Sequence, residues 1–158
     1  MASQAAVDKH RVTAVLVSHN GAVWLPEVVA ALTSQTRPID LITAVDTGSQ
    51  DASTKLLKSA RIPFISADVE TGFGEAVSLA VDKLPKNVDH EWIWLIHDDC
   101  APAPTALAEL IAAIDDRPQV VMVGPKLLGW HDRTHLLEAG ISIAGNGARW
   151  TGLEPLEY

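Results

Sequence analysis

The chain has 158 residues, of which 47% are hydrophobic and 20% are charged. This length and composition are typical of one folded domain and exclude a disordered tail. Twenty Asp and Glu against twelve Lys and Arg leave a net charge of -8, which disfavours a nucleic-acid backbone as a partner. A single cysteine excludes an intrachain disulfide, and no apolar run approaches the roughly 20 residues of a membrane span.

Strands and helices are predicted to alternate along the chain. Apolar runs bounded by turn residues predict strands over residues 11–18, 39–45, 63–66, 92–96 and 119–123. Apolar residues spaced three and four apart predict helices around residues 25–32, 51–57, 72–84 and 107–114. This alternation indicates an α/β fold with a mostly parallel sheet. After Gly124 the helical periodicity is lost, and residues 136–143 predict one or two further strands.

Polar residues and glycines follow the predicted strands, where an open parallel sheet binds its ligands. The first three strands lead to Ser18, His19, Asn20, Asp46, Gly48 and Gly72. We expect these positions to surround a polar ligand. The residues by themselves leave the role of Asp46 open between a turn carboxylate and an acceptor for a base or sugar.

Two adjacent carboxylates, Asp98 and Asp99, follow His97 at the end of the apolar strand WIWLI. Like charges this close repel each other unless a cation lies nearby. A divalent cation with oxygen ligands would remove the conflict and could bridge a diphosphate. A second interpretation stays open, in which one of the two carboxylates caps the turn before Pro102.

Two common nucleotide-binding motifs are absent from the sequence. No G-x-G-x-x-G pattern follows the first strand, where HNGAVW stands, and there is no Walker phosphate loop. Their absence disfavours a dinucleotide-dependent oxidoreductase and a P-loop NTPase.

A series of motifs resembles family 2 glycosyltransferases with the GT-A fold. In chain order they are TAVLVSHNGAVWLPEVVAALTSQTRPID, AVDTGSQDAS, TGFGEAVSLAV, IWLIHDDCAPAPTALAEL, and VVMVGPKLLGW with LLEAGISI. The resemblance covers residues 11–158 and implies a Rossmann-like, mostly parallel sheet flanked by helices that binds a nucleotide sugar. The last motifs resemble those of members that act on cell-envelope glycans.

The resemblance also implies roles for individual residues. Asp46 would hydrogen-bond the nucleotide base, and Ser18 and His19 would line the nucleotide pocket together with Asn20, Gly48 and Gly72. Asp99 would bind Mg²⁺ or Mn²⁺ directly, and Asp98 would face the donor ribose or sugar and serve as a further metal ligand. His97 stands where many members carry Asp, which puts the usual metal preference in question.

The resemblance divides the chain into a flexible N-terminus (1–10), a nucleotide-sugar-binding core (11–125) and the start of an acceptor-side region (126–158). Inverting members take their general base from the acceptor-side half. We therefore expect the fold to be truncated on the acceptor side, the base to lie beyond Tyr158, and this chain alone to transfer little or no sugar. The donor implies a cytoplasmic location, with contact to the inner face of the membrane through a C-terminal part.

The leading hypothesis is a metal-dependent inverting glycosyltransferase, of which this chain is the donor-binding portion. It would move a sugar from a nucleotide diphosphate sugar to a glycan or lipid-linked acceptor. One alternative is a nucleotidyltransferase, although the basic glycine-rich loop of that class is missing after the first strand. The other is a non-catalytic nucleotide-binding or assembly module that forms a homo-oligomer.

Overall fold

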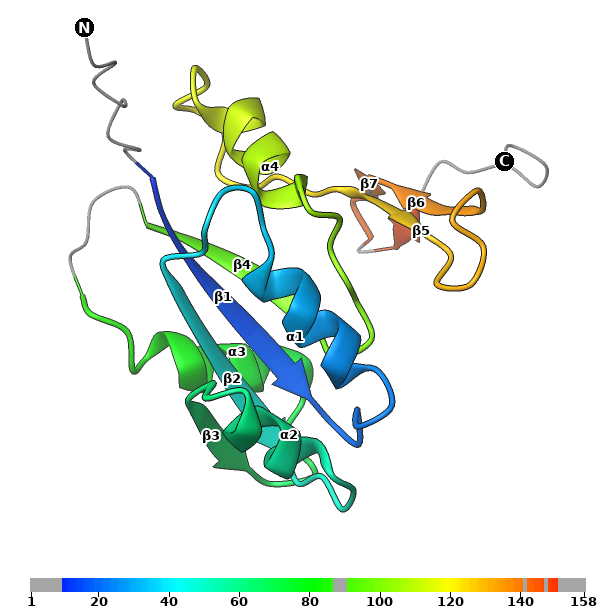
Figure 1. Ribbon diagram of the computed structural model, residues 1–158. Helices are drawn as coiled ribbons and strands as arrows, with labels where there is room; N and C mark the ends of the chain where they lie inside the picture. Colours follow the sequence, from blue (N-terminus) through cyan, green and yellow to red (C-terminus); the bar gives the residue numbers. More distant parts are fainter. Residues whose placement is uncertain (1–9, 87–90, 141, 147, 151–158) are drawn as a thin grey trace, which may run out of the picture. The chain divides into compact units, whose positions relative to one another are not determined.

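The structure is a computed structural model, and it describes residues 10–86, 91–140, 142–146 and 148–150 (Figure 1). The chain forms two compact units, Met1–Ala108 and Glu109–Tyr158, which are described separately below. The predicted flexible N-terminus lies outside the described residues, except for His10.

The first unit is built on a parallel sheet with the strand order β3-β2-β1-β4. Its strands are β1 (Arg11–Ser18), β2 (Leu41–Thr47), β3 (Phe64–Ala67) and β4 (Glu91–His97). The first predicted strand is the most deeply buried, because β1 has neighbours on both sides and helices on both faces. Its register pairs Ser18 with Asp46 and Val17 with His97, so the polar ends of three strands meet at one edge.

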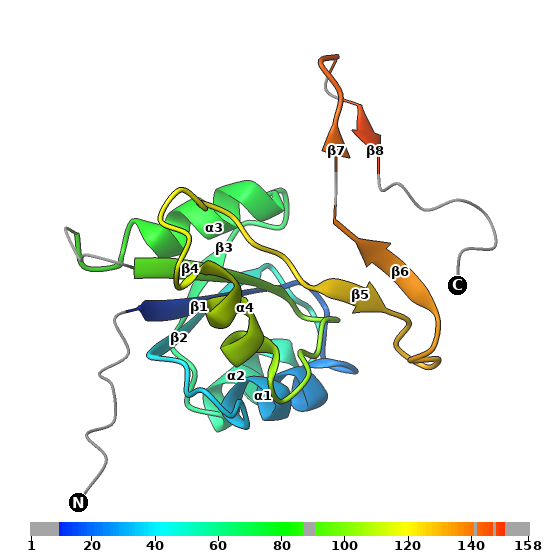
Figure 2. The same cartoon turned by 90° about the horizontal axis from the view of Figure 1, so that it is seen from above.

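Helices cover both faces of this sheet, as the alternating pattern predicted. Helices α1 (Leu25–Thr33) and α2 (Ser53–Ser59) lie on one face, and α3 (Phe73–Val81) lies on the opposite face (Figure 2). Helix α4 (Ala106–Ile114) begins in the first unit and continues into the second. The first unit therefore has the three-layer arrangement of an α/β fold.

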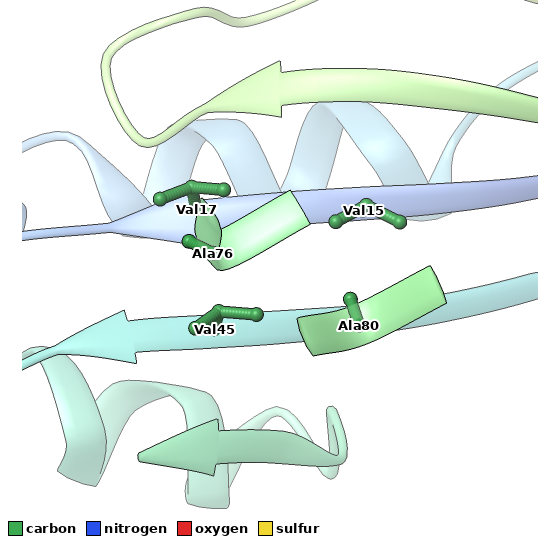
Figure 3. Packing of buried hydrophobic residues seen from close by; sticks show 5 residues of the cluster. All are labelled: Val15, Val17, Val45, Ala76 and Ala80. Atoms are coloured by element: carbon green, nitrogen blue, oxygen red, sulfur yellow. The ribbon is translucent and has the colours of Figure 1, made fainter. Parts of the chain in front are cut away.

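The face beneath α3 carries a core of small and β-branched side chains (Figure 3). Its buried members are Val15, Val17, Val45, Ala76 and Ala80. Side chains alternate along a strand, so Val15 and Val17 point to the same side, and the small alanines let α3 approach the sheet closely. Phe73, the first residue of α3, packs against this cluster and is thereby held at the carboxyl edge of the sheet.

The opposite face buries the apolar stripe of α1. Leu25, Val28 and Leu32 are its buried residues, at the spacing of three and four that the sequence shows. Leu16, the neighbour in sequence of Val15 and Val17, is fully buried as well. Alternation of side chains in β1 thus supplies apolar contacts to the helices on both faces.

Two boundaries differ from the prediction. Strand β2 begins at Leu41 instead of residue 39 and extends to Thr47, so Asp46 belongs to a strand and not to a turn. The helix predicted around residues 51–57 begins at Ser53, and its N-cap is Ala52. The Asp51 Oδ1 accepts hydrogen bonds from the Ser53 amide (2.9 Å) and hydroxyl (2.5 Å), forming a local turn just before the helix.

The second unit contains two short antiparallel pairs. Strand β5 (Lys126–Leu128) pairs with β6 (Leu136–Ala139), and β7 (Ser142–Ile143) pairs with β8 (Arg149–Trp150). One or two strands were predicted over 136–143, and β6 and β7 lie there. Within the described residues, no helix has both the length and the apolar character that crossing a membrane requires.

The strand predicted over residues 119–123 is wrong. These residues form a turn followed by irregular chain, and Val121 and Met122 are 88% and 85% exposed. A β-branched apolar run becomes a strand only where a neighbouring strand supplies backbone hydrogen bonds and a surface to pack on. Neither is present around this segment in the second unit as the structure describes it.

Candidate functional site

A hollow of about 240 Å³ lies at the carboxyl edge of the sheet in the first unit. It is lined by Val17, His19, Thr47, Val69, Thr71, Phe73, His97 and Asp98. The chain runs from β1 outward to β2 and β3 and then returns to place β4 on the other side of β1. This reversal between β1 and β4 is the position where open α/β sheets bind ligands.

Asp98 connects the two sides of this reversal. Its Oδ2 accepts a hydrogen bond of 2.7 Å from the backbone amide of His19, in the loop after β1. Gly21 in the same loop has no side chain, and a Cβ there would lie only 2.2 Å from that Oδ2. Glycine at position 21 thus leaves the space that Asp98 needs to reach the loop. The bond to the His19 amide uses Oδ2 of Asp98 and leaves Oδ1 out.

The side chain of His19 is held by contacts to Thr47 and Asn20. Its Nδ1 lies 2.7 Å from the carbonyl oxygen of Thr47, and its Nε2 lies 3.1 Å from Nδ2 of Asn20. A carbonyl can only accept, so Nδ1 carries the proton and Nε2 accepts from the Asn20 amide. Both ring nitrogens of His19 therefore have partners within the protein.

The loops after β1 and β2 are joined by reciprocal hydrogen bonds. The backbone amide of Asn20 donates to Oγ of Ser49 (2.9 Å), and the backbone amide of Gln50 donates to the side-chain Oδ1 of Asn20 (2.8 Å). Asn20 has a φ of 52°, a left-handed conformation that asparagine tolerates better than most residues. These bonds fix the predicted site residue Asn20 as a link between the loops.

Asp51 adds a second link between the same loops. Its Oδ2 accepts a bond of 2.9 Å from the amide of Ala22. The hydroxyl of Ser53, followed by the amides of Ala22 and Ser53, lowers the pKa of Asp51 despite the opposing effect of desolvation. The carboxylate therefore stays ionised and keeps the link at neutral pH.

Ser18 and Asp46 form a pair of buried polar residues at the ends of β1 and β2. They are register partners and are 0% and 3% exposed. Oδ2 of Asp46 accepts from the Ser49 amide at 3.2 Å, but neither Oδ1 of Asp46 nor Oγ of Ser18 has a partner among the described residues. A buried polar atom without a partner costs about 1–3 kcal/mol. The two residues lie next to Val17, His19 and Thr47 of the hollow but are not among the residues that line it.

Of the two predicted glycine positions, Gly48 requires glycine and Gly72 does not. Gly48 has a φ of 75°, and a Cβ there would lie 3.1 Å from Val69, so glycine is required. Gly72 is the N-cap of α3, has an extended conformation, and leaves open space where a Cβ would stand. Its contribution is to keep the start of α3 uncovered beside the pocket residues Thr71 and Phe73.

His97, Asp98 and Asp99 form a cluster that fits a divalent cation. One ligand atom from each lies within 4.8 Å of the others, close to the roughly 4.2 Å between oxygens on opposite sides of an octahedral Mg²⁺. His97 and Asp99 are exposed and Asp98 is half-buried, so an ion could retain waters or ligand oxygens. The ring of His97 stacks on Phe73 at a centroid distance of 4.2 Å and an angle of 9°.

Sequence reasoning missed Gly21 and Phe73 as site residues. Phe73 was visible in the motif TGFGEAVSLAV, but only the packing shows that its ring lies flat against the ring of His97. Gly21 appeared as a strand breaker, and no local signal shows that its missing side chain makes room for a residue 77 positions away.

The sequence profile of glycosyl transferase family 2 matches residues 13–135, and the chain belongs to this family. Membership supports a glycosyltransferase over both alternative hypotheses. Among curated proteins, no sequence matches.

Several solved structures share the fold. The Pyrobaculum calidifontis mannosyltransferase PcManGT, in complex with GDP-Man and Mn²⁺, has a TM-score of 0.59 and 19% identity over 68% of this chain and 33% of its own. The Mycobacterium tuberculosis glucosyl-3-phosphoglycerate synthase, in complex with Mn²⁺, UDP and glucosyl-3-phosphoglycerate, has a TM-score of 0.54 and 18% identity. The match covers 75% of this chain and 43% of the synthase. S. aureus TarS in complex with UDP has a TM-score of 0.55 and 17% identity. The match covers 68% of this chain and 33% of TarS.

These likenesses identify the fold as GT-A. The chain spans between about a third and two fifths of the length of these structures.

Proposed function

We propose that the pocket at the carboxyl edge of the first unit binds a nucleotide diphosphate sugar together with a divalent metal. The protein would then transfer the sugar, with inversion, to a glycan or lipid-linked acceptor. The observation that carries this proposal is the cluster of His97, Asp98 and Asp99 beside the pocket of a family 2 chain.

The nucleotide would be held by the loops that follow β1 and β2. Among the described residues, Oδ1 of Asp46 is buried without a partner, and an N–H of a nucleotide base would satisfy it. Ser18, His19, Asn20 and Gly48 would shape the surrounding wall, and Gly72 would leave the start of α3 open. UDP and GDP-Man in the similar structures support a nucleotide ligand at this edge.

Asp99 and Asp98 would hold the metal, Mg²⁺ or Mn²⁺. When bound, such an ion neutralises charge on the leaving diphosphate. Mn²⁺ accompanies the donor or the nucleotide in two of the similar structures, which supports a divalent ion at this site. Asp98 would also keep the loop after β1 in place through its bond to His19.

The acceptor and the location follow from the last motifs and from the donor. The motifs VVMVGPKLLGW and LLEAGISI resemble those of members that act on cell-envelope glycans. A nucleotide sugar is supplied in the cytoplasm, so we place the reaction there, with the acceptor on a glycan or lipid carrier.

Isothermal titration calorimetry tests the proposal. UDP and GDP are titrated into the protein with Mn²⁺, with Mg²⁺, and with EDTA. We expect at least one nucleotide to bind with metal only, and Asp99→Ala to weaken this binding by tenfold or more, on the order of what lost metal-site interactions cost. Asp82→Ala is the matched control, because Asp82 is an exposed carboxylate at the end of α3 that pairs with Lys86. Metal-independent binding, or no binding by a folded sample, would contradict the proposal.

A further inference from the structure

Two histidines line the pocket, and their ring nitrogens differ in availability. Both nitrogens of His19 are engaged, by the carbonyl of Thr47 and the amide of Asn20. No hydrogen bond reaches a ring nitrogen of His97 within the described part of the chain, and its side chain is exposed. Only His97 can therefore offer a nitrogen to a ligand without breaking an existing contact.

The stacking of His97 on Phe73 leaves those nitrogens accessible. The two rings are nearly parallel, with an angle of 9° and a centroid distance of 4.2 Å, so the contact covers one face of the imidazole. The coordinating lone pair of an imidazole, on its unprotonated nitrogen, lies in the plane of the ring and points outward from its edge. Phe73 is fixed by the core cluster under α3 and can limit the rotation of His97 without covering the nitrogens.

Asp98 and Asp99 place two carboxylates within reach of that ring edge. The three ligand atoms lie within 4.8 Å of one another, so one ion could contact all three after small movements of exposed side chains. Mg²⁺ prefers oxygen ligands, whereas imidazole suits later divalent metals. Affinity for a given site also rises from Mn²⁺ to Co²⁺ in the first transition row.

We propose that His97 binds the same divalent ion as Asp98 and Asp99 through a ring nitrogen, and that this imidazole shifts the preference of the site from Mg²⁺ towards Mn²⁺ and Co²⁺. The inference rests on the proposed function, because the ion is the one that accompanies the nucleotide. Phe73 is a positioning residue, which acts by holding the imidazole plane towards the carboxylates.

Pulsed EPR of the protein with Mn²⁺ and UDP, and separately with Mn²⁺ and GDP, tests the nitrogen ligand directly. We expect a ¹⁴N coupling typical of a directly bound imidazole, and we expect ¹⁵N-labelled histidine to replace it with a ¹⁵N coupling. The labelling separates histidine nitrogen from the nitrogens of the base. His97→Asp should abolish the coupling, and His131→Asn, in the second unit, should leave it unchanged.

Calorimetry with the same nucleotides tests the metal preference. We expect His97→Asp to lower the ratio of Mn²⁺-supported to Mg²⁺-supported affinity by about tenfold, in line with the effect of a changed metal environment. Phe73→Leu should keep the ¹⁴N coupling but weaken Mn²⁺ binding several-fold, because it retains the nitrogen and loses its orientation. Circular dichroism checks that each variant is folded.

Two results would overturn this inference while the proposed function stands. One is metal-dependent nucleotide binding with bound Mn²⁺ that shows no histidine coupling. The other is an unchanged Mn²⁺ to Mg²⁺ ratio in folded His97→Asp. If the folded protein binds neither nucleotide with any metal, the proposed function fails and this inference fails with it.

Discussion

At the scale of single residues, the site depends on the absence of a side chain at Gly21. The carboxylate of Asp98 occupies the space beside Gly21 and accepts the amide of His19. One carboxylate thus belongs to the cluster of His97, Asp98 and Asp99 and also holds the loop after β1. Any side chain at residue 21 competes with Asp98 for the same space.

Gly21→Ala is expected to impair both folding stability and binding. Its Cβ would lie 2.2 Å from Oδ2 of Asp98, so either the loop or the carboxylate must move. We expect a loss of about 1–3 kcal/mol in the free energy of unfolding, as for other overpacked sites, measured in urea. We also expect metal-dependent nucleotide binding to weaken by about tenfold or more, measured by calorimetry.

Gly74→Ala is the control for the stability effect. Gly74 lies in the first turn of α3, and nothing lies within 4 Å of a Cβ built there. Alanine should stabilise this helix by up to about 1 kcal/mol. If Gly21→Ala were as stable as the wild type and bound nucleotide equally well, the close packing of Asp98 on Gly21 would be refuted.

At the scale of elements, Gln35 joins the end of α1 to the segment between β4 and α4. Its Nε2 donates to the carbonyls of Ala31 (3.0 Å) and Ala103 (2.9 Å), and its Oε1 accepts from the amide of Leu107 (3.0 Å). The side chain is 7% exposed, so these bonds are shielded from water. The amide side chain of Gln35, together with the bond from the Thr36 amide to the carbonyl of Pro104 (2.8 Å), therefore fixes the connection from β4 to α4.

Gln35→Ala is expected to destabilise the protein by about 1–3 kcal/mol, because buried backbone groups lose their partners. Urea denaturation measures the change in the free energy of unfolding. Gln50→Ala is the matched control, because its side chain is exposed and donates to the carbonyl of Gly48 (3.1 Å) on the surface of the protein. We expect that variant to remain within about 0.5 kcal/mol of the wild type. Equal effects of the two substitutions would contradict the role given to Gln35.

At the scale of the whole molecule, the sheet brings distant segments to one edge. The pocket combines residues from the ends of β1, β2 and β4 with the segment before α3. A ligand that bridges these segments must stabilise the first unit, because it binds only where they are assembled.

We expect nucleotide and metal together to raise the melting temperature of the first unit. At a free ligand concentration of 100 times Kd, binding adds about 2.7 kcal/mol, or roughly 11–22 °C for a unit of this size. Differential scanning calorimetry with UDP or GDP and Mn²⁺ measures the shift, and the shift should be smaller for either component alone. An equal shift with nucleotide and EDTA would contradict metal-dependent binding.

Much of the first unit could be predicted from the sequence because its signals are local. The uninterrupted apolar run at residues 11–18 predicts a buried strand, and it forms the central β1. The same signal misled at residues 119–123, because strand formation also needs a partner strand that no local pattern reveals. Asp98 and Asp99 were predicted to lie together at a strand end, and they do.

By itself, the sequence determined the alternation of strands and helices, the polar ends of the strands, and the family motifs that point to a nucleotide and a metal. Periodicity and turn residues encode these features within a few neighbouring positions. Only the tertiary structure decided that Asp98 reaches across to His19 over Gly21 and that Phe73 orients His97. Those contacts join residues far apart in the chain, and they exist only because the parallel sheet brings the carboxyl ends of its strands to one edge.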